Sequence, residues 1–197
     1  MNKNIPYYDI IMRCTDFHNV KIAPLPMGFH FKFYEDGDEY YWAKLETDVN
    51  EFENIDSALD YFHRTFTPFK EFLFNRMIFV IDPNGEYVAT STAWFKDDDK
   101  RHYALLHWVC VSLKQRSNGL GNCVVSYALA NFITLEPYEK EVFLHTQTWS
   151  FKAIGLYYKF GFKITDQKLV NSVTDFDALS VLKEVLPKKI TDHLIES

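Results

Sequence analysis

Apolar residues recur at helical spacing in the first part of the chain and gather into short strand-like runs after residue 76. Ala58, Tyr61, Phe62 and Phe66 lie three or four positions apart, which predicts an amphipathic helix capped near Asp56-Ser57. The later runs are shorter and nearly continuous in apolar residues, which is typical of buried strands. The pattern therefore changes after residue 76, where the first of these short strands is predicted.

The segments Met77–Ile81 and Tyr87–Phe95 are predicted to form a β-hairpin, because Asp82-Pro83-Asn84-Gly85 between them is a strong turn signal. Asp36-Gly37-Asp38 is expected to be a turn and helix cap. Further strands are predicted at residues 10–12, 28–34, 103–111, 142–146 and 163–170, and helices at 39–45, 119–135, 151–160 and 179–194, the last interrupted by Pro187. Antiparallel strands precede a strand–helix–strand–helix–strand series, so we expect a mixed α+β fold around one sheet, in a single domain of residues 1–197.

Composition narrows the class of protein without indicating an activity. Of the 197 residues, 47% are hydrophobic and 24% charged, and the net charge is −6, as expected for a globular protein with a sizeable core. An acidic chain without a basic patch is not expected to bind nucleic acid. The mixed charge run Lys96–Arg101 is interpreted as a solvated turn, with attraction of a cationic substrate as the alternative.

The cysteines indicate a reducing compartment. Cys14, Cys110 and Cys123 are odd in number and lack CxxC spacing, so we expect neither a disulfide framework nor a zinc site. The start Met1–Pro6 lacks the apolar stretch of a signal peptide, and no apolar run approaches the ~18 residues of a membrane span. The expectation is a cytoplasmic protein that binds no membrane and no metal.

A glycine-containing turn is the most informative local feature. Arg116-Ser117-Asn118-Gly119-Leu120-Gly121 follows a predicted strand that ends near Val111, and it opens a predicted helix. Glycine lets backbone N–H groups approach an anion, and the start of a helix adds unpaired donors and partial positive charge. A pyrophosphate is the natural ligand, and a strand-to-helix turn without a ligand is the alternative. The spacing matches neither a dinucleotide-binding glycine motif nor a Walker loop, which weakens a nucleotide-binding interpretation.

Two motifs in the right order resemble those of the GNAT acyltransferases. The family's cofactor motif, Arg/Gln-x-x-Gly-x-Gly/Ala, preceded by a strand valine, corresponds to Arg116–Gly121 after Val111. The family's second motif, Asn-x-x-Ala-x-x-Leu-Tyr-x-x-x-Gly-Phe, corresponds to Ser150–Phe162, with Ser150 where Asn is common. The resemblance implies a mainly antiparallel sheet flanked by helices and splayed between its two central strands. It also implies acetyl-CoA as cosubstrate.

The resemblance covers residues 77–170 well and implies three consecutive parts. We expect an acceptor-side part at about 1–75, an acetyl-CoA-binding core at 76–170 and a C-terminal extension at 171–197. Thr90–Trp94, His107–Val109 and Leu144–Thr148 look like a mycothiol-synthase-like subgroup. The implied reaction is direct attack of a primary amine on acetyl-CoA in a ternary complex, with a small amine as acceptor. A homodimer is compatible with the family.

The resemblance also implies which residues bind the cofactor. Backbone groups of the first splayed strand are expected to lie along the pantetheine arm, with the Val109 amide as a donor to the thioester oxygen. The expected cofactor-binding residues are Val109, Cys110, Val111, Arg116, Ser117, Asn118, Gly119, Leu120, Gly121, Asn122, Ser150 and Tyr157. The alternative for the strand side chains is ordinary core packing, which is also the interpretation of Cys110 and Cys123.

Tyr157 occupies the family position that protonates the departing thiolate. A phenol with a pKa near 10 is well matched to a thiol. The alternative is a packed core aromatic, and Tyr158 is a weaker candidate because it faces another side of the helix.

The general base is predicted to be His107. Strand alternation places it on the face of Val109 and Val111, and histidines on the same strand resemble those of arylalkylamine acetyltransferases. A buried structural histidine and catalysis by water are the alternatives, and His145 is a weaker candidate.

Two further questions stay open at the level of sequence. A non-catalytic acyl-CoA-binding sensor or assembly module is the alternative to an N-acetyltransferase. The acceptor-side aromatics either line a pocket or form core: Tyr40, Tyr41, Trp42, Phe62 and Phe66.

Overall fold

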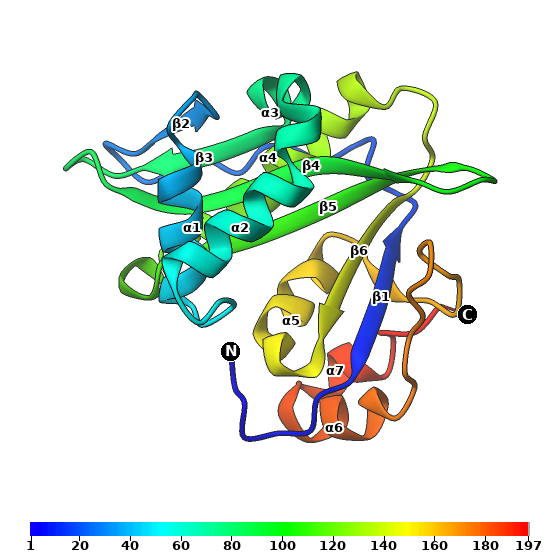
Figure 1. The fold of residues 1–197 in the computed structure, drawn as a ribbon. Helices are drawn as coiled ribbons and strands as arrows, with labels where there is room; N and C mark the ends of the chain where they lie inside the picture. Colours follow the sequence, from blue (N-terminus) through cyan, green and yellow to red (C-terminus); the bar gives the residue numbers. More distant parts are fainter. Residues whose placement is uncertain (197) are drawn as a thin grey trace. The chain divides into compact units, whose positions relative to one another are not determined.

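The computed structural model describes residues 1–196 and forms a sheet of seven strands in the order β2-β3-β4-β5-β6-β1-β7 (Figure 1). The strands are β1 (Asp9–Cys14), β2 (His30–Phe33), β3 (Met77–Ile81), β4 (Tyr87–Asp97), β5 (His102–Val111), β6 (Val142–Gln147) and β7 (Lys163–Ile164). The pairs β2–β3, β3–β4, β1–β6 and β1–β7 are antiparallel, and β5–β6 is parallel. The predicted mixed α+β fold with a mainly antiparallel sheet is confirmed.

Seven α-helices accompany the strands in the described chain. They are α1 (Glu39–Asp48), α2 (Ile55–Thr65), α3 (Lys70–Arg76), α4 (Leu120–Leu135), α5 (Phe151–Lys159), α6 (Ala178–Val185) and α7 (Lys188–Thr191). Short 3-10 turns occur at Thr67–Phe69, Leu113–Gln115 and Thr148–Ser150. Pro187 separates α6 from α7, as predicted, because proline cannot continue a helix. None of the helices described is long and apolar enough to cross a membrane.

The chain forms two compact units. The central unit comprises Lys21–Trp94 and His107–Asn131. The terminal unit comprises Met1–Val20, Phe95–Leu106 and the chain from Phe132 onward. The expectation of one domain in three consecutive parts stays a prediction, as does the splay between β5 and β6. Their parallel pairing joins Ala104 to Val142 and Leu105 to Phe143, at the beginning of both strands.

In the central unit, helices cover both faces of the strands (Figure 1). On one face, Ile78, Val80, Val88 and Ala89 of β3 and β4 form a core cluster with Leu120 and Val124 of α4. Every residue of β3 is buried. The cluster helps to exclude water from this strand. The hydroxyl of Ser91 donates to the Val124 carbonyl at 2.9 Å, which satisfies a buried polar group within the same layer.

An aromatic layer of α1 and α2 covers the other face. The Trp42 ring contacts Phe62, Phe66 and Trp108, with ring centroids 5.3–5.9 Å apart, and such edge-to-face packing adds to the burial of large rings. Trp42, Phe62 and Phe66 are therefore core residues. Tyr40 and Tyr41 were listed with them above as acceptor-side aromatics, but these two side chains are 48% and 41% exposed.

Two predicted helix caps differ from the structure. Asn54, rather than Asp56-Ser57, is the N-cap of α2: its side chain accepts from the Ser57 N–H at 2.9 Å, and the Ser57 hydroxyl completes a capping box. Asp38 precedes α1 but makes no side-chain cap. Its carboxylate instead accepts from Lys32 Nζ and the Tyr87 hydroxyl. A buried carboxylate takes the strongest donors available, and here these come from the neighbouring strands.

In the terminal unit, β1 lies between β6 and β7 (Figure 1). Ile11 is opposite His145 of β6, and Met12 is opposite both Leu144 of β6 and Ile164 of β7. Both residues of β1 are fully buried. The Ile11 N–H donates to the Thr174 hydroxyl at 3.0 Å, so an irregular segment also binds this strand.

The predicted strand at residues 163–170 is wrong beyond Ile164. Asp166, Gln167 and Lys168 are exposed and polar, so they provide no apolar face for a sheet. Val170 adopts φ 56°, a left-handed conformation that ends extended structure for a β-branched residue.

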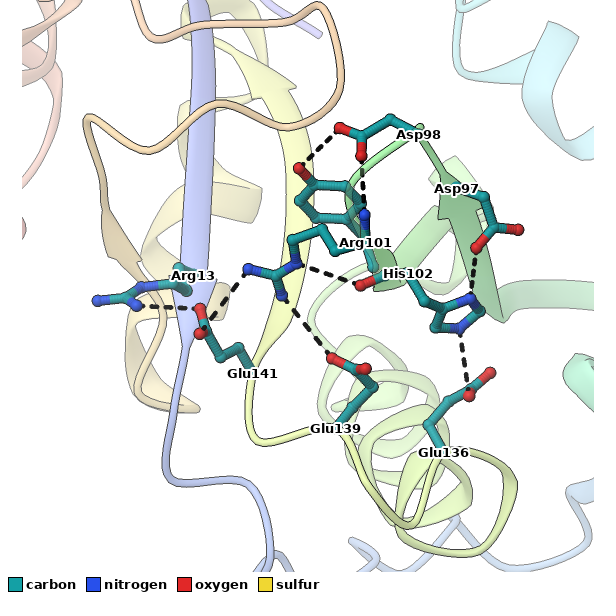
Figure 2. A network of polar contacts seen from close by, with 9 residues as sticks. Arg13, Asp97, Asp98, Arg101, His102, Glu136, Glu139 and Glu141 are labelled. Carbon is teal, nitrogen blue, oxygen red and sulfur yellow. Dashed lines mark hydrogen bonds and ion pairs between the residues drawn. The ribbon is translucent and has the colours of Figure 1, made fainter.

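Within the charge run Lys96–Arg101, the first two residues end β4 and the other four form the predicted turn to β5, beside an ionic network of the terminal unit (Figure 2). Asp98 accepts from the backbone N–H groups of Lys100 and Arg101, which lowers the pKa of its carboxyl. His102 lies between Asp97, at 2.7 Å, and Glu136, at 3.2 Å. The turn is thus fixed by local polar contacts.

A second part of this network joins strands of the terminal unit (Figure 2). Arg13 of β1 pairs with Glu141 at 2.9 Å and with Glu196 at 2.7 Å. The pKa of the Arg13 guanidinium is raised, mainly by its hydrogen bond to Glu196 and next by its hydrogen bond to Glu141. Arg101 lies 3.7 Å from Glu139. The network therefore ties both ends of the chain to the middle.

Candidate functional site

The glycine-containing turn has the geometry of an anion-binding helix start. Gly119 adopts φ 79° and is the residue before α4, and its carbonyl accepts from the N–H groups of Asn122 at 2.9 Å and Cys123 at 3.3 Å. The first N–H groups of an α-helix have no partner within the helix and point outward from its start. An added Cβ on Gly119 would meet nothing within 4 Å, so the space in front of this turn is open. Backbone donors, helix dipole and open space together suit a phosphate group.

Side chains around the turn divide into exposed and anchoring groups. Arg116, Ser117 and Asn118 are exposed, and the Asn118 amide donates to Gln115 Oε1 at 2.8 Å. The side chain of Leu120, the first residue of α4, is buried in the core cluster, so only its backbone can face a ligand. Ser117 adopts φ 70°, a second left-handed residue that helps reverse the chain.

Side chains at the end of β5 pack against both layers of the central unit, the core cluster and helix α1. Val109 and Val111 pack against the core cluster of β3, β4 and α4. Cys110 faces α1, where its thiol donates to the Leu45 carbonyl at 3.5 Å. Burial raises the pKa of the Cys110 thiol well above its ordinary value, which opposes thiolate chemistry. Cys110 is buried and the two valines are partly buried against the core cluster, so the polar contacts that this segment can offer a cofactor come from its backbone.

Alternation along β5 is interrupted at Trp108, which differs from the regular strand assumed from sequence. Trp108 adopts φ 48°, outside the range of extended backbone. Its ring faces α1 and α2, while the His107 ring contacts Phe66 at 6.1 Å between centroids. His107 therefore lies near the aromatic layer and not in the core cluster that holds Val109 and Val111. Its role as general base stays a prediction.

Tyr157 and Ser150 belong to the terminal unit. Tyr157 of α5 is 7% exposed, and its ring lies 6.0 Å from that of Phe162. The Phe162 N–H donates to the Tyr157 carbonyl at 3.2 Å, so the family-type Gly161-Phe162 pair closes the C-terminal end of this helix. Ser150 precedes α5 without a side-chain cap and instead accepts from Gln147 Nε2 at 3.4 Å.

The structure thus brings together Arg116–Asn122 and Val109–Val111 in the central unit. Tyr157 and Ser150 lie in the other unit, and a joint site with the turn stays a prediction. His145, the weaker base candidate, is half-exposed, and its Nε2 lies 2.9 Å from the carboxylate Oδ1 of Asp9. No cluster of three or more His, Cys, Asp or Glu side chains within residues 1–196 is placed to hold a metal ion.

Glu46 is a polar residue of the central unit that the sequence analysis missed. Its side chain is 2% exposed, and Oε1 has no hydrogen-bond partner within the described chain. Burial raises the pKa of its carboxyl well above the ordinary value, with repulsion from Glu51 as the second cause. Its spacing could have predicted its burial, because Glu46 lies four residues after Trp42 and therefore on the same, buried face of the helix.

The sequence of residues 32–162 matches the profile of the acetyltransferase (GNAT) family. No curated protein sequence matches the chain significantly. Among solved structures, a GCN5-related N-acetyltransferase from Sphaerobacter thermophilus is similar, with 16% identity and a TM-score of 0.60 over 81% of this chain and 49% of that one. A tandem GNAT protein from the clavulanic acid biosynthesis pathway gives 15% identity and a TM-score of 0.61 over 83% and 51%.

Glucosamine-6-phosphate N-acetyltransferase from Arabidopsis thaliana is also similar, with 17% identity and a TM-score of 0.52 over 76% of this chain and 99% of that one. At these identities the likeness concerns the fold. The chain spans about half the length of the Sphaerobacter and tandem proteins.

Proposed function

Because the chain belongs to the acetyltransferase (GNAT) family, we propose that it transfers an acetyl group from acetyl-CoA to a primary amine by direct attack in a ternary complex. The observation that carries the proposal is the open, left-handed turn at Gly119 in front of α4. It offers an anion several backbone donors in a position that the family profile includes.

Residues of the turn and of β5 suit the cofactor. In this proposal the N–H groups of Gly119, Leu120 and Gly121 hold the pyrophosphate, with Arg116, Ser117, Asn118 and Asn122 around it. Backbone groups of Val109, Cys110 and Val111 bind the pantetheine arm. The thioester of acetyl-CoA supplies the activated acetyl group. Ser150 belongs to the same proposed set of cofactor-binding residues.

Two side chains move protons in the proposed reaction. The amine must lose a proton to attack, and His107, or water in its place, takes it. The leaving sulfur must gain one, and the Tyr157 phenol donates it. An amide bond forms and the thioester bond breaks, so no further reactant is needed. We propose a small amine as acceptor, and the mycothiol-synthase-like grouping, the homodimer and the cytoplasmic location belong to the same proposal.

Isothermal titration of the purified protein with acetyl-CoA tests the proposal, with ATP and NAD as controls. Saturable binding of acetyl-CoA alone is the expected result, and thiol release in an amine screen would then identify the acceptor. Binding of acetyl-CoA without turnover on any amine would favour the acyl-CoA-binding module instead. No binding of acetyl-CoA would overturn the proposal.

A further inference from the structure

A recess of about 210 Å³ lies in the terminal unit, where β1, β7 and the end of the described chain meet. Four of its five lining residues are charged or polar: Arg13, Thr15, Gly161, Lys163 and Glu196. None of them belongs to the proposed set of cofactor-binding residues. The recess is therefore a candidate for a second, separate ligand site.

Two cations lie side by side at this recess. Arg13 of β1 and Lys163 of β7 are directly opposite each other in the antiparallel pair. Side chains of opposite residues point to the same face of a sheet, with Cβ atoms about 4.5–5.5 Å apart, and like charges in such a pair are destabilising. An anion bound between the two side chains would offset this repulsion.

Only one of the two cations has partners in the described chain. The Arg13 guanidinium donates through Nη1 to Glu141 at 2.9 Å, as Figure 2 shows, and through Nε to Glu196 at 2.7 Å. Lys163 is half-buried, and its ammonium group makes no hydrogen bond or ion pair within residues 1–196. The charge of Arg13 is thus balanced, and that of Lys163 is not.

Unused hydrogen-bond donors outnumber acceptors around the recess. A guanidinium has five N–H donors, and the Nη2 atom of Arg13 binds nothing among the described residues. Lys163 offers three more, and the hydroxyl of the exposed Thr15 also lacks a partner in this part of the chain. Glu196, the lining carboxylate, is already bound to Arg13 through Oε1. This surplus of donors favours a ligand that accepts hydrogen bonds and carries negative charge.

We propose that the recess binds a small oxyanion, the phosphate or carboxylate group of a metabolite, between Lys163 and Arg13 Nη2. The Thr15 hydroxyl is the third donor. Hydrogen bonds between ionised partners are roughly twice as strong as those between neutral ones. The inference goes beyond the proposed function, because it assigns a second ligand to residues that the proposed reaction does not use.

Other ligands fit the recess less well. A cation would meet Arg13 and Lys163, and the Phe160 carbonyl beside the recess already accepts from the Cys14 thiol at 3.2 Å. An apolar ligand would leave the half-buried ammonium group without a partner. A ligand with several negative groups would also face Glu196, which limits the site to one anionic group. Hydration of Lys163 by water is the alternative that the experiment must separate.

NMR titration of the nitrogen-15-labelled protein with sodium phosphate or sodium acetate tests the inference, because it shows which residues respond. Sodium chloride at the same ionic strength is the control for general screening of charges. Lys163→Gln removes the unpaired charge and keeps a polar side chain. Lys168→Gln is the matched control, because Lys168 lies five residues further along, is exposed and does not line the recess.

Saturable shifts of the Thr15, Gly161 and Lys163 amide signals with phosphate or acetate, but not with chloride, are the expected result. The anion that binds more tightly identifies the group. Lys163→Gln should weaken the binding by about tenfold or more, whereas Lys168→Gln should not change it. Absence of saturable shifts, equal shifts with chloride, or unchanged affinity in a folded Lys163→Gln protein would overturn the inference. The comparison of anions on the unmodified protein decides even if the variant does not fold.

The same titration separates this site from the proposed cofactor turn. Phosphate bound at the turn would shift the amide signals of Gly119, Leu120 and Gly121, and Lys163→Gln would not affect those shifts. Shifts confined to the turn would overturn the inference about the recess and would support the proposed function. Shifts confined to the recess would support the inference and leave the proposed function to the titration with acetyl-CoA.

Urea unfolding without added phosphate or acetate gives an independent check. Lys163→Gln should unfold at no lower urea concentration than the unmodified protein, because it removes one of two opposed like charges. A clear loss of stability in this variant would mean that the protein itself binds the Lys163 ammonium group, and it would contradict the inference.

Discussion

At the residue scale, the raised pKa of Glu46 makes stability depend on pH in a direction opposite to that of a salt-bridged carboxylate. Folding favours the protonated form, because burial penalises the charge. Stability from this group is complete below the ordinary glutamate pKa and is lost as pH rises above it, until the folded pKa is reached. The slope is about 1.4 kcal/mol per pH unit where only the unfolded state is ionised.

Urea unfolding at pH 5.0 to 7.5 measures this effect. The unmodified protein should lose stability across the range by more than Glu46→Gln does, since glutamine cannot ionise. Glu53→Gln, which changes an exposed carboxylate, should keep the unmodified slope. Equal slopes in all three proteins would mean that the Glu46 carboxyl is solvated or paired.

Tyr157 is the residue for which turnover and cofactor affinity should separate. Tyr157→Phe removes the proposed proton donor and keeps the ring that packs near Phe162. Loss of a general acid lowers turnover by about 10²-fold or more, while acetyl-CoA affinity should change little. Tyr158→Phe is the control, because Tyr158 is the neighbouring half-buried phenol and is expected to leave turnover intact. Equal effects of both substitutions would contradict the assignment of Tyr157.

Residues of the site were predictable to different degrees for physical reasons. Gly119 could be singled out because a glycine between a strand and a helix lets backbone N–H groups approach an anion, and its φ of 79° is one that glycine adopts without strain. The buried, unpartnered carboxyl of Glu46 could not be predicted, because a sequence does not show whether the fold provides a hydrogen-bond partner for a carboxyl on the apolar face of a helix. The orientation of His107 depended on Trp108, and nothing in the sequence marks a tryptophan as the irregular residue of a strand.

At the element scale, two glycines at helices should respond to alanine with opposite signs. Gly119 has open space for a methyl group but φ 79°, so Gly119→Ala is expected to cost about 1 kcal/mol in backbone strain. Gly155 lies within α5, where an added Cβ would make ordinary contact with Leu186 at 3.5 Å. Gly155→Ala should therefore stabilise by about 0.5–1 kcal/mol, since alanine is the better helix former.

Chemical denaturation of both variants against the unmodified protein checks the pair. Because the two substitutions add the same methyl group, a difference in sign isolates the backbone contribution at Gly119. Destabilisation by both would show that the Gly155 position is more tightly packed against α6 and α7 than its contacts indicate.

Elements defined by local patterning were predictable, and those defined by tertiary context were not. The hairpin of β3 and β4 follows from a turn signal between apolar runs. The N-cap of α2 was misplaced by two residues, because Asn54, Asp56 and Ser57 all have cap-forming side chains and only the backbone course selects among them. β7 is two residues long, since its polar continuation offers nothing to bury.

At the scale of the whole molecule, the strand order separates elements that are neighbours in sequence. β1 is the first strand of the chain, yet both of its neighbours, β6 and β7, follow residue 141. Sequence patterning predicted a strand at residues 10–12 but not its place in the sheet, because pairing across such a separation leaves no local signal. The prediction of one α+β sheet was confirmed without that knowledge, because it depends on the kinds of elements and not on their pairing.

Proline substitution should show how much stability this returning strand contributes. Ile11→Pro removes an N–H that donates to Thr174 at 3.0 Å and places proline in a strand paired on both edges. We expect a loss of about 3 kcal/mol or more, measured by urea unfolding. Met27→Pro is the matched control. Met27 is 97% exposed and occupies the second position of a turn in which the Phe29 N–H donates to the Pro26 carbonyl, where proline is favoured. If both variants were equally stable, β1 would be a peripheral strand despite its pairing, and the terminal unit would depend on its other elements.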